Sequence, residues 1–412
     1  MLRKAVKLSL VFLLCLFICG CMPSSENQAD TSTAELNSVS SKKTDPLTII
    51  TSSSGIICTE LSADEECFYF LRGMQDATAQ ILKYSLETFE ITELSSEPVP
   101  DILGGGFITH AGSRMLVFKT GHVPYKDIYE GMSSILYILD MNGTVKNAIT
   151  LPAQQLFKSN SAVAFDGDHI LFLILSLLED GDSGPVNVKD ELCSVDLASG
   201  EITSLETLSV ETSTVITASC PDGLILTTIA NRKDLTQSVY SLEKGETVRG
   251  VSFDFLDNAY TYVTDGSGGY YYINDGEDTL MYGSIYGGTK VAAKDLNITG
   301  NAEYLPYISS GVCDNHLTVD LDNSLTSDTI YVDLASGEIT KAPEREFSCR
   351  IAYESEDYIV LSAGIEYIDT TMNVNGVEYP FEEGATRFIA VPKAEFWSGS
   401  AEYIEFNDLV RK

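Results

Sequence analysis

The sequence predicts an all-β domain in which one four-stranded antiparallel sheet repeats seven times around an axis. Three observations predict it: an octapeptide that occurs twice, a series of seven hairpin turns along the chain, and a second series of seven that alternates with the first. Helical evidence is nearly absent, because no window of 11 or more residues between positions 46 and 412 keeps an apolar period of 3.6.

The octapeptide Asp-Leu-Ala-Ser-Gly-Glu-Ile-Thr occupies residues 196–203 and again residues 333–340. The two copies are 137 residues apart, or three units of about 46 residues, a length typical of propeller repeats. Each copy lies between two β-rich runs, and its Ser-Gly pair is a turn signal. Each copy therefore predicts a strand, a tight turn and a returning strand.

Weaker versions of this hairpin occur along the whole chain. Their turn centres are Phe89, Gly143, Gly200, Gly245, Gly288, Gly337 and Gly399, the last being the poorest match. Polar turns followed by strongly apolar strands form the second series, at Ala63, His110, Phe165, Cys220, Thr264, Cys313 and Glu354. Two interleaved hairpins per unit make a meander of four strands, here A to D from the axis outward.

Seven such meanders can close around an axis and leave only short strand edges. We therefore predict a seven-bladed β-propeller over residues 46–412, with a six- or eight-bladed ring as the alternative. The pattern resembles bacterial β-propellers of the loosely repeating type often found on surface lipoproteins, which implies an architecture and no particular activity. A short extra strand at residues 47–51 is expected to pair with the last blade near residues 402–406 and help to close the ring.

Residues 1–20 have the layout of a secretory signal. A basic start precedes an apolar run from Leu8 to Cys19, and this run is shorter than the roughly 20 residues that a membrane-spanning helix needs. The segment from Ile18 to Cys21 resembles the lipobox of bacterial lipoproteins, with Cys19 as its one departure. That resemblance implies lipid on Cys21 and a location on the outer face of the cell membrane, and an ordinary cleaved signal is the alternative.

The segment after the signal, residues 21–45, predicts a flexible tether. It is rich in Ser, Thr, Asn and Glu and has few large apolar groups, so it cannot bury enough surface to fold. The whole chain carries a formal net charge of −34, which repels nucleic acid and anionic lipid headgroups. The charge thus excludes nucleic acid as a partner and favours cations, a basic partner, or simply a solvated extracellular surface.

Six cysteines follow the signal and Cys21, and their spacing matches neither a compact disulfide scaffold nor a zinc site. Cys58 and Cys67 flank a predicted hairpin turn, which would place them opposite one another across a strand pair. They are the candidate disulfide. The other four, Cys193, Cys220, Cys313 and Cys349, lie in apolar strand patterns and are interpreted as small core residues.

Three B–C connections are unusually long: residues 119–134 in the second blade, 178–189 in the third and 365–386 in the seventh. In a closed ring they fall in one sector of one face, and long loops in compact repeats are often functional. We predict a ligand-binding surface there, against the alternative of variable loops without a ligand. Its candidate ligand-binding residues are His122, Tyr125, Lys126, Tyr129, Tyr367 and Asp369.

Asp180 and Asp182 lie two residues apart beside glycines, as a hard cation such as calcium would require. They are the candidate metal ligands, with a solvated acidic turn as the alternative, because the later acidic ligand of a complete calcium loop is missing. No motif for any other cofactor occurs.

The fifth blade is rich in tyrosine, whose rings suit sugars and peptides. Alternation along the strands nevertheless sends Tyr270 and Tyr272 to one side and Tyr271 to the other, which favours packing between blades. The inventory for catalysis is thin, with four scattered histidines and no hydrolase, zinc-protease or nucleotide-binding motif.

We therefore expect a non-catalytic binding or scaffolding module that presents the long-loop face to a protein, a peptide or a cell-wall glycan. The alternative is a propeller hydrolase or lyase acting on extracellular carbohydrate with carboxylates near the channel mouth. Clustered carboxylates with raised pKa values in a cleft would favour the enzyme.

Overall fold

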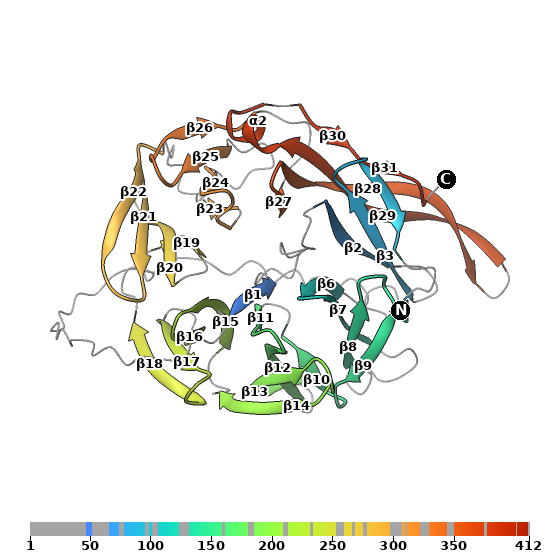
Figure 1. Cartoon of the computed structure of the whole chain (residues 1–412), viewed down its shortest axis with the longest axis horizontal. Coiled ribbons are helices and arrows are strands. Elements are labelled where there is room, and N and C mark those ends of the chain that lie inside the picture. The colour runs from blue at the N-terminus through green and yellow to red at the C-terminus, as the bar shows by residue number, and fades with distance from the viewer. Residues whose placement is uncertain are drawn as a thin grey trace. The chain divides into compact units, whose positions relative to one another are not determined.

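Seven separate β-sheets lie around a common central axis, so the fold is a seven-bladed β-propeller, as the two hairpin series predict (Figure 1). The structure is a computed structural model. It describes residues 47–51, 66–73, 78–94, 99–100, 106–122, 132–158, 161–179, 185–208, 213–230, 234–252, 259–265, 268–274, 278–296, 307–309, 311–321, 329–343, 350–374, 377–400 and 402–410.

The strands of the first four blades are listed here in chain order. Blade 1 holds β2 (Cys67–Gly73), β3 (Thr78–Ser85) and β4 (Glu90–Glu93), with β5 (Val99–Pro100) beside β3. Blade 2 holds β6 (Gly106–Ala111), β7 (Arg114–His122), β8 (Met132–Asp140) and β9 (Val145–Thr150).

Blade 3 holds β11 (Val163–Phe165), β12 (His169–Glu179), β13 (Pro185–Asp196) and β14 (Ile202–Leu208), with β10 (Gln155–Phe157) beside β12. Blade 4 holds β15 (Ser213–Cys220), β16 (Gly223–Ala230), β17 (Asp234–Ser241) and β18 (Glu246–Ser252).

The last three blades complete the ring. Blade 5 holds β19 (Ala259–Thr264), β20 (Gly269–Asn274), β21 (Thr279–Ser284) and β22 (Thr289–Lys294); blade 6 holds β23 (Tyr307–Ile308), β24 (His316–Asp320), β25 (Thr329–Asp333) and β26 (Ile339–Lys341); blade 7 holds β27 (Arg350–Glu354), β28 (Tyr358–Val374), β29 (Val377–Pro392) and β30 (Ile404–Glu405), with the short helix α2 (Lys393–Trp397) between β29 and β30.

The seven predicted turn centres all have positive φ, between 55° and 88°. Six of them are glycines, which reach this region without steric cost. Phe89 is the exception, with φ of 55°. Its ring packs against Tyr358 and Phe406, with centroids 5.4 and 5.9 Å away, so aromatic contacts hold a backbone conformation that L-residues avoid.

The two octapeptide copies form the same hydrogen-bonded turn. In blade 3, the carboxylate of Asp196 accepts the N–H groups of Ala198 and Ser199 at 3.0 and 2.6 Å. In blade 6, the carboxylate of Asp333 accepts those of Ala335 and Ser336 at 2.7 and 3.0 Å. The repeated sequence therefore repeats one structure, a C–D turn held by its leading aspartate.

The core lies between the blades. In blade 2, Met115 and Val117 of β7 face blade 1, whereas Leu116 and Phe118 face blade 3, and all four are buried. Successive side chains of a strand point to opposite faces, so a blade covered on both faces needs apolar residues at successive positions. This requirement explains the apolar runs that follow the polar A–B turns.

The first strand, β1 (Thr48–Thr51), does not pair with the last blade, and the expectation that it would is wrong. It pairs instead with the innermost strand of blade 3, where Thr48 lies opposite Phe165, and its Ile50 carbonyl accepts a hydrogen bond from Thr109 of blade 2. The strand β1 has only four residues, and no tight turn links it to its partner strand, so its sequence carries no signal for the pairing register. The pairing was therefore set by contacts distant in sequence.

The C-terminus closes the ring. The strand β31 (Asn407–Asp408) pairs in parallel with β4 of blade 1, and Arg72 binds Asp408 with 2.9 Å between nitrogen and oxygen. Phe406 packs on Phe68 and Tyr84. Residues 406–408 thus form a latch between blades 7 and 1.

Candidate binding surface

The B–C connections lie at the opposite end of each blade from the A–B and C–D turns, because consecutive strands of a meander run in opposite directions. The three long connections belong to blades 2, 3 and 7, in the part of the ring where blade 1 separates 7 from 2 (Figure 1). Each connection therefore belongs to the blade in which the sequence places it, and the grouping of the three into one ligand-binding surface stays a prediction.

Much of each predicted loop is strand. In blade 2 the pairing continues to His122 opposite Met132, and in blade 3 it continues to Glu179 opposite Pro185. In blade 7 it runs from Ile365 opposite Thr386 to Val374 opposite Val377. The prediction of a loop at residues 365–386 was wrong, because these residues form a two-stranded ribbon.

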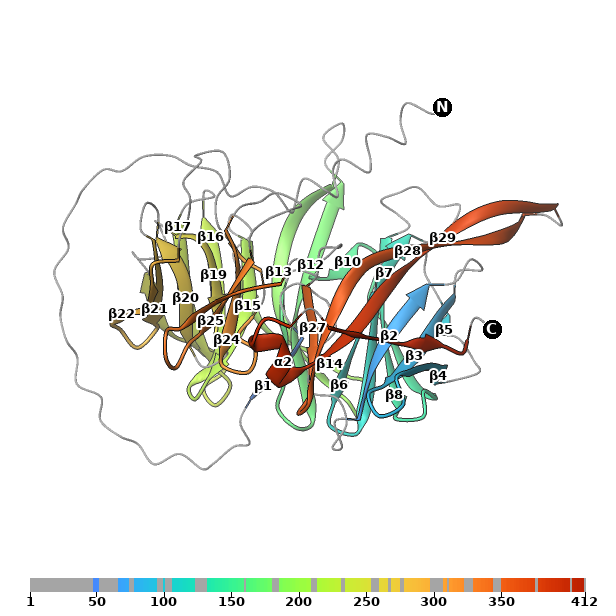
Figure 2. The ribbon, with the colours of Figure 1, turned by 90° about the horizontal axis from the view of Figure 1, so that it is seen from above.

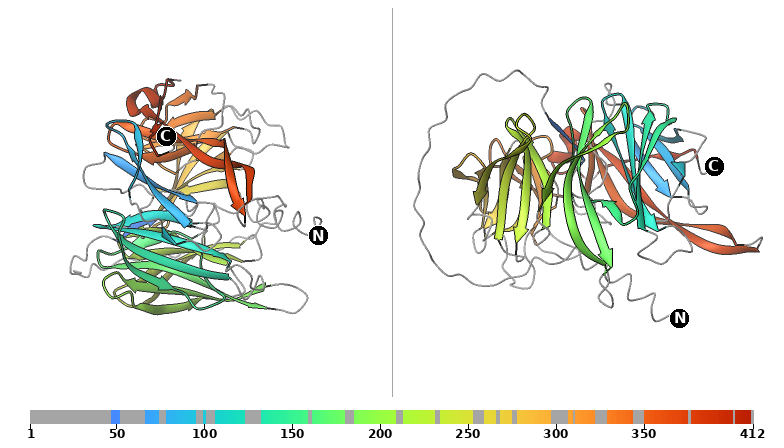
Figure 3. Two further views of the ribbon diagram at one scale, coloured as in Figure 1. Left: turned by 90° about the vertical axis from the view of Figure 1, so that its right-hand side faces the viewer. Right: turned by 90° about the horizontal axis from the view of Figure 1, so that it is seen from below.

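This blade-7 ribbon, residues 365–374 and 377–386, projects from the rest of blade 7 (Figures 2 and 3). Ten cross-strand pairs at about 3.4 Å per residue give it a length of roughly 30 Å. It begins at a register shift between Ser362 and Ile365, which includes Gly364 with φ of 93°. The positive φ at this glycine bends the strand out of the blade.

Both outer edges of the ribbon are open within the described part of the chain. On one side, β27 pairs with β28 only as far as Ser362. On the other side, β30 pairs with β29 only at Ile389 and Ala390. The ribbon therefore carries two rows of backbone N–H and C=O groups of the kind to which another polypeptide strand can add.

The base of the ribbon is apolar at its surface. The side chains of Ile365 and Tyr367 are 61% and 67% exposed, the largest fractions among the exposed large hydrophobic residues described. The ribbon also contains five acidic residues and no Lys, Arg or His. It thus combines aromatic and aliphatic contact area with a negative charge.

The structure places two of the predicted ligand-binding residues on this ribbon. Tyr367 lies opposite Gly384 and Asp369 lies opposite Glu382, at alternate positions of the same strand. His122 lies at the end of β7 in blade 2. Tyr125, Lys126 and Tyr129 lie outside the described residues, so the grouping of all six residues into one site stays a prediction.

The predicted metal site and one cysteine of the predicted disulfide lie outside the described residues. Asp180 and Asp182 lie outside the described residues, and among the residues described no group of three His, Cys, Asp or Glu side chains could hold a metal ion. Cys67 is buried, and its Sγ lies 3.3 Å from the Tyr69 hydroxyl. Cys58 lies outside the described residues, so its pairing with Cys67 stays a prediction.

The other described cysteines are buried free thiols, as their apolar patterns predict. Burial raises the pKa of the Cys193 thiol to about 12, with a smaller contribution from the negative charge of Glu191. Burial likewise raises the pKa of Cys313. Such thiols are poor nucleophiles, because the reactive form is the thiolate.

The carboxyl pKa values of Asp140, Glu191, Asp196 and Asp333 are lowered, and hydrogen bonds to each carboxylate are the largest cause. These four carboxylates hold local structure, whereas the general acid of a glycosidase is a carboxyl group with a raised pKa.

The tyrosines of blade 5 mostly pack between blades, as the alternation predicts. Tyr270 and Tyr272 are buried against blade 4, and Tyr271 packs on the side of blade 6. Burial raises the pKa of Tyr270 to about 12. Tyr286, by contrast, is 47% exposed at the outer turn.

No helix in the described part of the chain is long and apolar enough to cross a membrane. No protein-family profile and no curated protein sequence matches the chain.

Solved structures are similar to the chain in fold. A puromycin-hydrolysing peptidase from Mycobacterium tuberculosis aligns over 88% of this chain and 56% of its own, with a TM-score of 0.50 and 12% identity. Acylaminoacyl peptidase from Pyrococcus horikoshii aligns over 82% of this chain with a TM-score of 0.45 and 14% identity, and the chain spans 50% of its length.

The β-propeller domain of Cps50 (Swd1) from Myceliophteria thermophila aligns over 77% of this chain and 96% of its own, with a TM-score of 0.44 and 9% identity. At sequence identities this low, the likeness concerns the fold alone, and a fold of this kind hosts many unrelated functions.

Proposed function

We propose that this chain is a lipid-anchored, extracytoplasmic binding module whose propeller presents the blade-7 ribbon to a polypeptide partner and catalyses no reaction. The observation that carries the proposal is the ribbon itself, with its two open edges and the exposed Ile365 and Tyr367 at its base. Open strand edges favour a polypeptide over a glycan, because main-chain hydrogen bonds to an added strand supply affinity.

The composition of the ribbon defines the partner further. Five acidic residues without a base attract a basic segment and repel an acidic one. Tyr367 supplies a large amphipathic contact area of the kind found at binding hot spots. The proposed partner segment is therefore extended, basic and partly apolar.

Site-specific photo-cross-linking in intact cells tests this proposal. A photoreactive amino acid at position 367 should give one discrete cross-linked product with another polypeptide. The same amino acid at position 286 is the matched control, because Tyr286 is also an exposed tyrosine but lies on blade 5. Absence of any product from position 367, or the same product from position 286, would refute the ribbon as the binding surface.

The lipid anchor has its own test. The variant Cys21→Ser lacks the sulfur atom to which the lipid is attached. Without the acyl chains of that lipid, the protein is no longer held at the membrane. We expect the wild-type chain in the membrane fraction and the variant in the soluble extracytoplasmic fraction. Retention of the variant in the membrane to the same extent as wild type would contradict lipidation at Cys21.

A further inference from the structure

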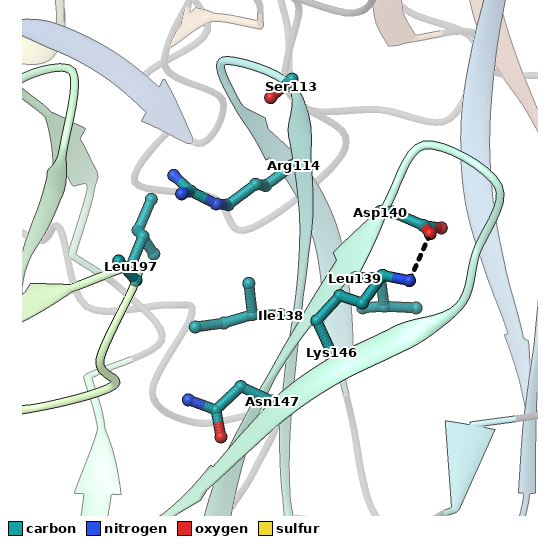
Figure 4. A pocket seen from close by; sticks show the side chains of 9 residues that line it. Ser113, Arg114, Ile138, Leu139, Asp140, Lys146, Asn147 and Leu197 are labelled. Atoms are coloured by element: carbon teal, nitrogen blue, oxygen red, sulfur yellow. Dashed lines mark ion pairs between the residues drawn. The ribbon is translucent and has the colours of Figure 1, made fainter.

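A cavity of about 480 Å³ opens between blades 2 and 3 (Figure 4). It lies at the end of the blades that carries the A–B and C–D turns, opposite the end that carries the ribbon. Its polar lining comes from the A–B turn and the C–D hairpin of blade 2, and its far wall comes from the octapeptide turn of blade 3. The lining residues are Ser113, Arg114, Ile138, Leu139, Asp140, Lys146, Asn147, Leu197 and Ala198.

Arg114 points into this cavity toward Leu197 (Figure 4). It is half-buried, and its guanidinium forms no hydrogen bond or ion pair with any residue in the described ranges. An arginine without a carboxylate partner is unexpected in a chain with 60 acidic and 26 basic residues. Its planar fork of donors is therefore available to a ligand.

The carboxylate of Asp140, which lies beside Arg114 on the next strand, is already engaged. Asp140 lies directly opposite Arg114 in the strand pairing, yet it binds Lys146 at 2.8 Å between nitrogen and oxygen. Its other oxygen accepts the N–H groups of Asn142 and Thr144, both at 3.0 Å. Asp140 thus neutralises Lys146 and holds its own turn, and it forms no ion pair with Arg114.

Asn147 adds a second donor. Its side-chain oxygen accepts the N–H of Ala148 at 2.9 Å, so its amide nitrogen is the group left for a ligand. A Cβ at Gly200 would lie 2.5 Å from that nitrogen. Glycine at this position therefore serves the turn and also makes room for the amide.

The remaining lining is aliphatic. Ile138 lies on the blade 2 side of the cavity, and Leu197 and Ala198 lie on the blade 3 side. Ligand cavities typically combine apolar walls with a few polar groups that set the orientation of the ligand. This cavity offers donors from Arg114, Asn147 and Ser113 above apolar walls, a combination that matches an anion with an apolar body.

We propose that this cavity is a second binding site, which takes a small monocarboxylate with an aliphatic body. A carboxylate matches the guanidinium in two parallel hydrogen bonds. A phosphate would bring a second negative charge against a single unpaired cation in a molecule with a net charge of −34. The site is independent of the proposed ribbon function.

The test follows the Nε–H signal of Arg114 in ¹⁵N spectra of the full chain in detergent, assigned by its absence in Arg114→Lys. The probe is N-acetyl-leucine, and its neutral counterpart is N-acetyl-leucinamide. The signal should shift and saturate with the carboxylate, and should not move with the amide or with inorganic phosphate at the same concentration. Arg114→Gln should weaken binding about tenfold or more, and Arg387→Gln, which removes an arginine from blade 7, should change it less than about twofold.

Equal response to the acid and the amide would overturn the proposal, and so would an unchanged affinity in Arg114→Gln. Saturation by phosphate as readily as by N-acetyl-leucine would overturn the assignment to a monocarboxylate. If Arg114→Gln does not fold, the comparison of acid, amide and phosphate on the wild-type chain still decides whether the cavity binds a monocarboxylate.

Discussion

Asp196 and Asp333 hold equivalent turns in blades 3 and 6. Backbone hydrogen bonds to each carboxylate are the largest cause of its lowered pKa. A carboxyl group with a lowered pKa in the folded state stabilises the fold above its unfolded pKa of about 3.9, and this contribution is lost as the pH falls through the folded pKa.

The pH dependence follows from that sign. In the double variant Asp196→Asn, Asp333→Asn the amide oxygen still accepts from the turn but no longer titrates in this range. We expect wild type to melt at a higher temperature than the variant at pH 7, and the gap to narrow as the pH falls from about 4 toward 2. Thermal melts across that range check it, and a constant or widening gap would contradict the role of the two carboxylates.

Phe89 combines an unfavourable backbone conformation with favourable packing, and two substitutions separate the two effects. Phe89→Gly relieves the positive φ but loses the aromatic contacts, so it should lower the free energy of unfolding by about 1–3 kcal/mol. Phe89→Ala loses the same contacts and keeps the backbone cost of the positive φ. The alanine variant should therefore have a free energy of unfolding about 1 kcal/mol lower than the glycine variant. Denaturant unfolding measures both, and an alanine variant at least as stable as the glycine variant would refute the argument.

At the scale of elements, the C-terminal latch joins the last blade to the first by adding β31 to the outer edge of blade 1, next to β4. Phe406 lies edge-on to Phe68 and Tyr84, with ring centroids 5.7 and 5.3 Å away. We expect Phe406→Ala to lower the free energy of unfolding by about 2–4 kcal/mol. The matched control Leu409→Ala, at an exposed position just after β31, should cost less than about 1 kcal/mol.

Hydrogen exchange then locates the effect. The amides of β4 and β31 should exchange faster in Phe406→Ala, because local unfolding of the propeller should begin at the latch between blades 7 and 1. Unchanged exchange at β4 together with unchanged stability would show that the ring closes by other contacts.

The elements that local signals determine were predictable from the sequence. All seven turn centres have positive φ. Six of them are glycines, which favour this conformation, whereas at Phe89 the aromatic packing decides. The short helix α2 at the seventh turn was not predicted, because five residues are too few for an apolar period to show. The pairing of β1 with blade 3 depends on contacts distant in sequence, which no local signal encodes.

The position of the blade-7 ribbon in the chain was predictable from the sequence, but its form was not. Long B–C connections pointed to blades 2, 3 and 7, but the ribbon was taken for a loop. A usable signal was present: Asn375 and Gly376 stand between Val374 and Val377, and Asn-Gly between β-rich runs is a strong hairpin signal. The cavity at Arg114 had no comparable signal, since its lining joins residues of two blades that only the closed ring brings together.

At the scale of the molecule, the propeller acts as a rigid support. Apolar clusters fill the spaces between blades, and a rigid scaffold suits loops and ribbons that bind a partner. The two proposed sites lie at opposite ends of the blades, so a partner on the ribbon leaves the Arg114 cavity accessible.

The binding of a polypeptide by the blade-7 ribbon is the central claim. Its most direct measurement compares co-purification of the cross-linked partner from detergent extracts with the full chain and with a variant in which an Asn-Gly turn replaces residues 365–386. Because residues 358–362 and 388–392 still pair in that variant, its melting temperature should stay close to that of wild type. We expect the partner to be lost from the variant, and its retention at wild-type levels would contradict the claim.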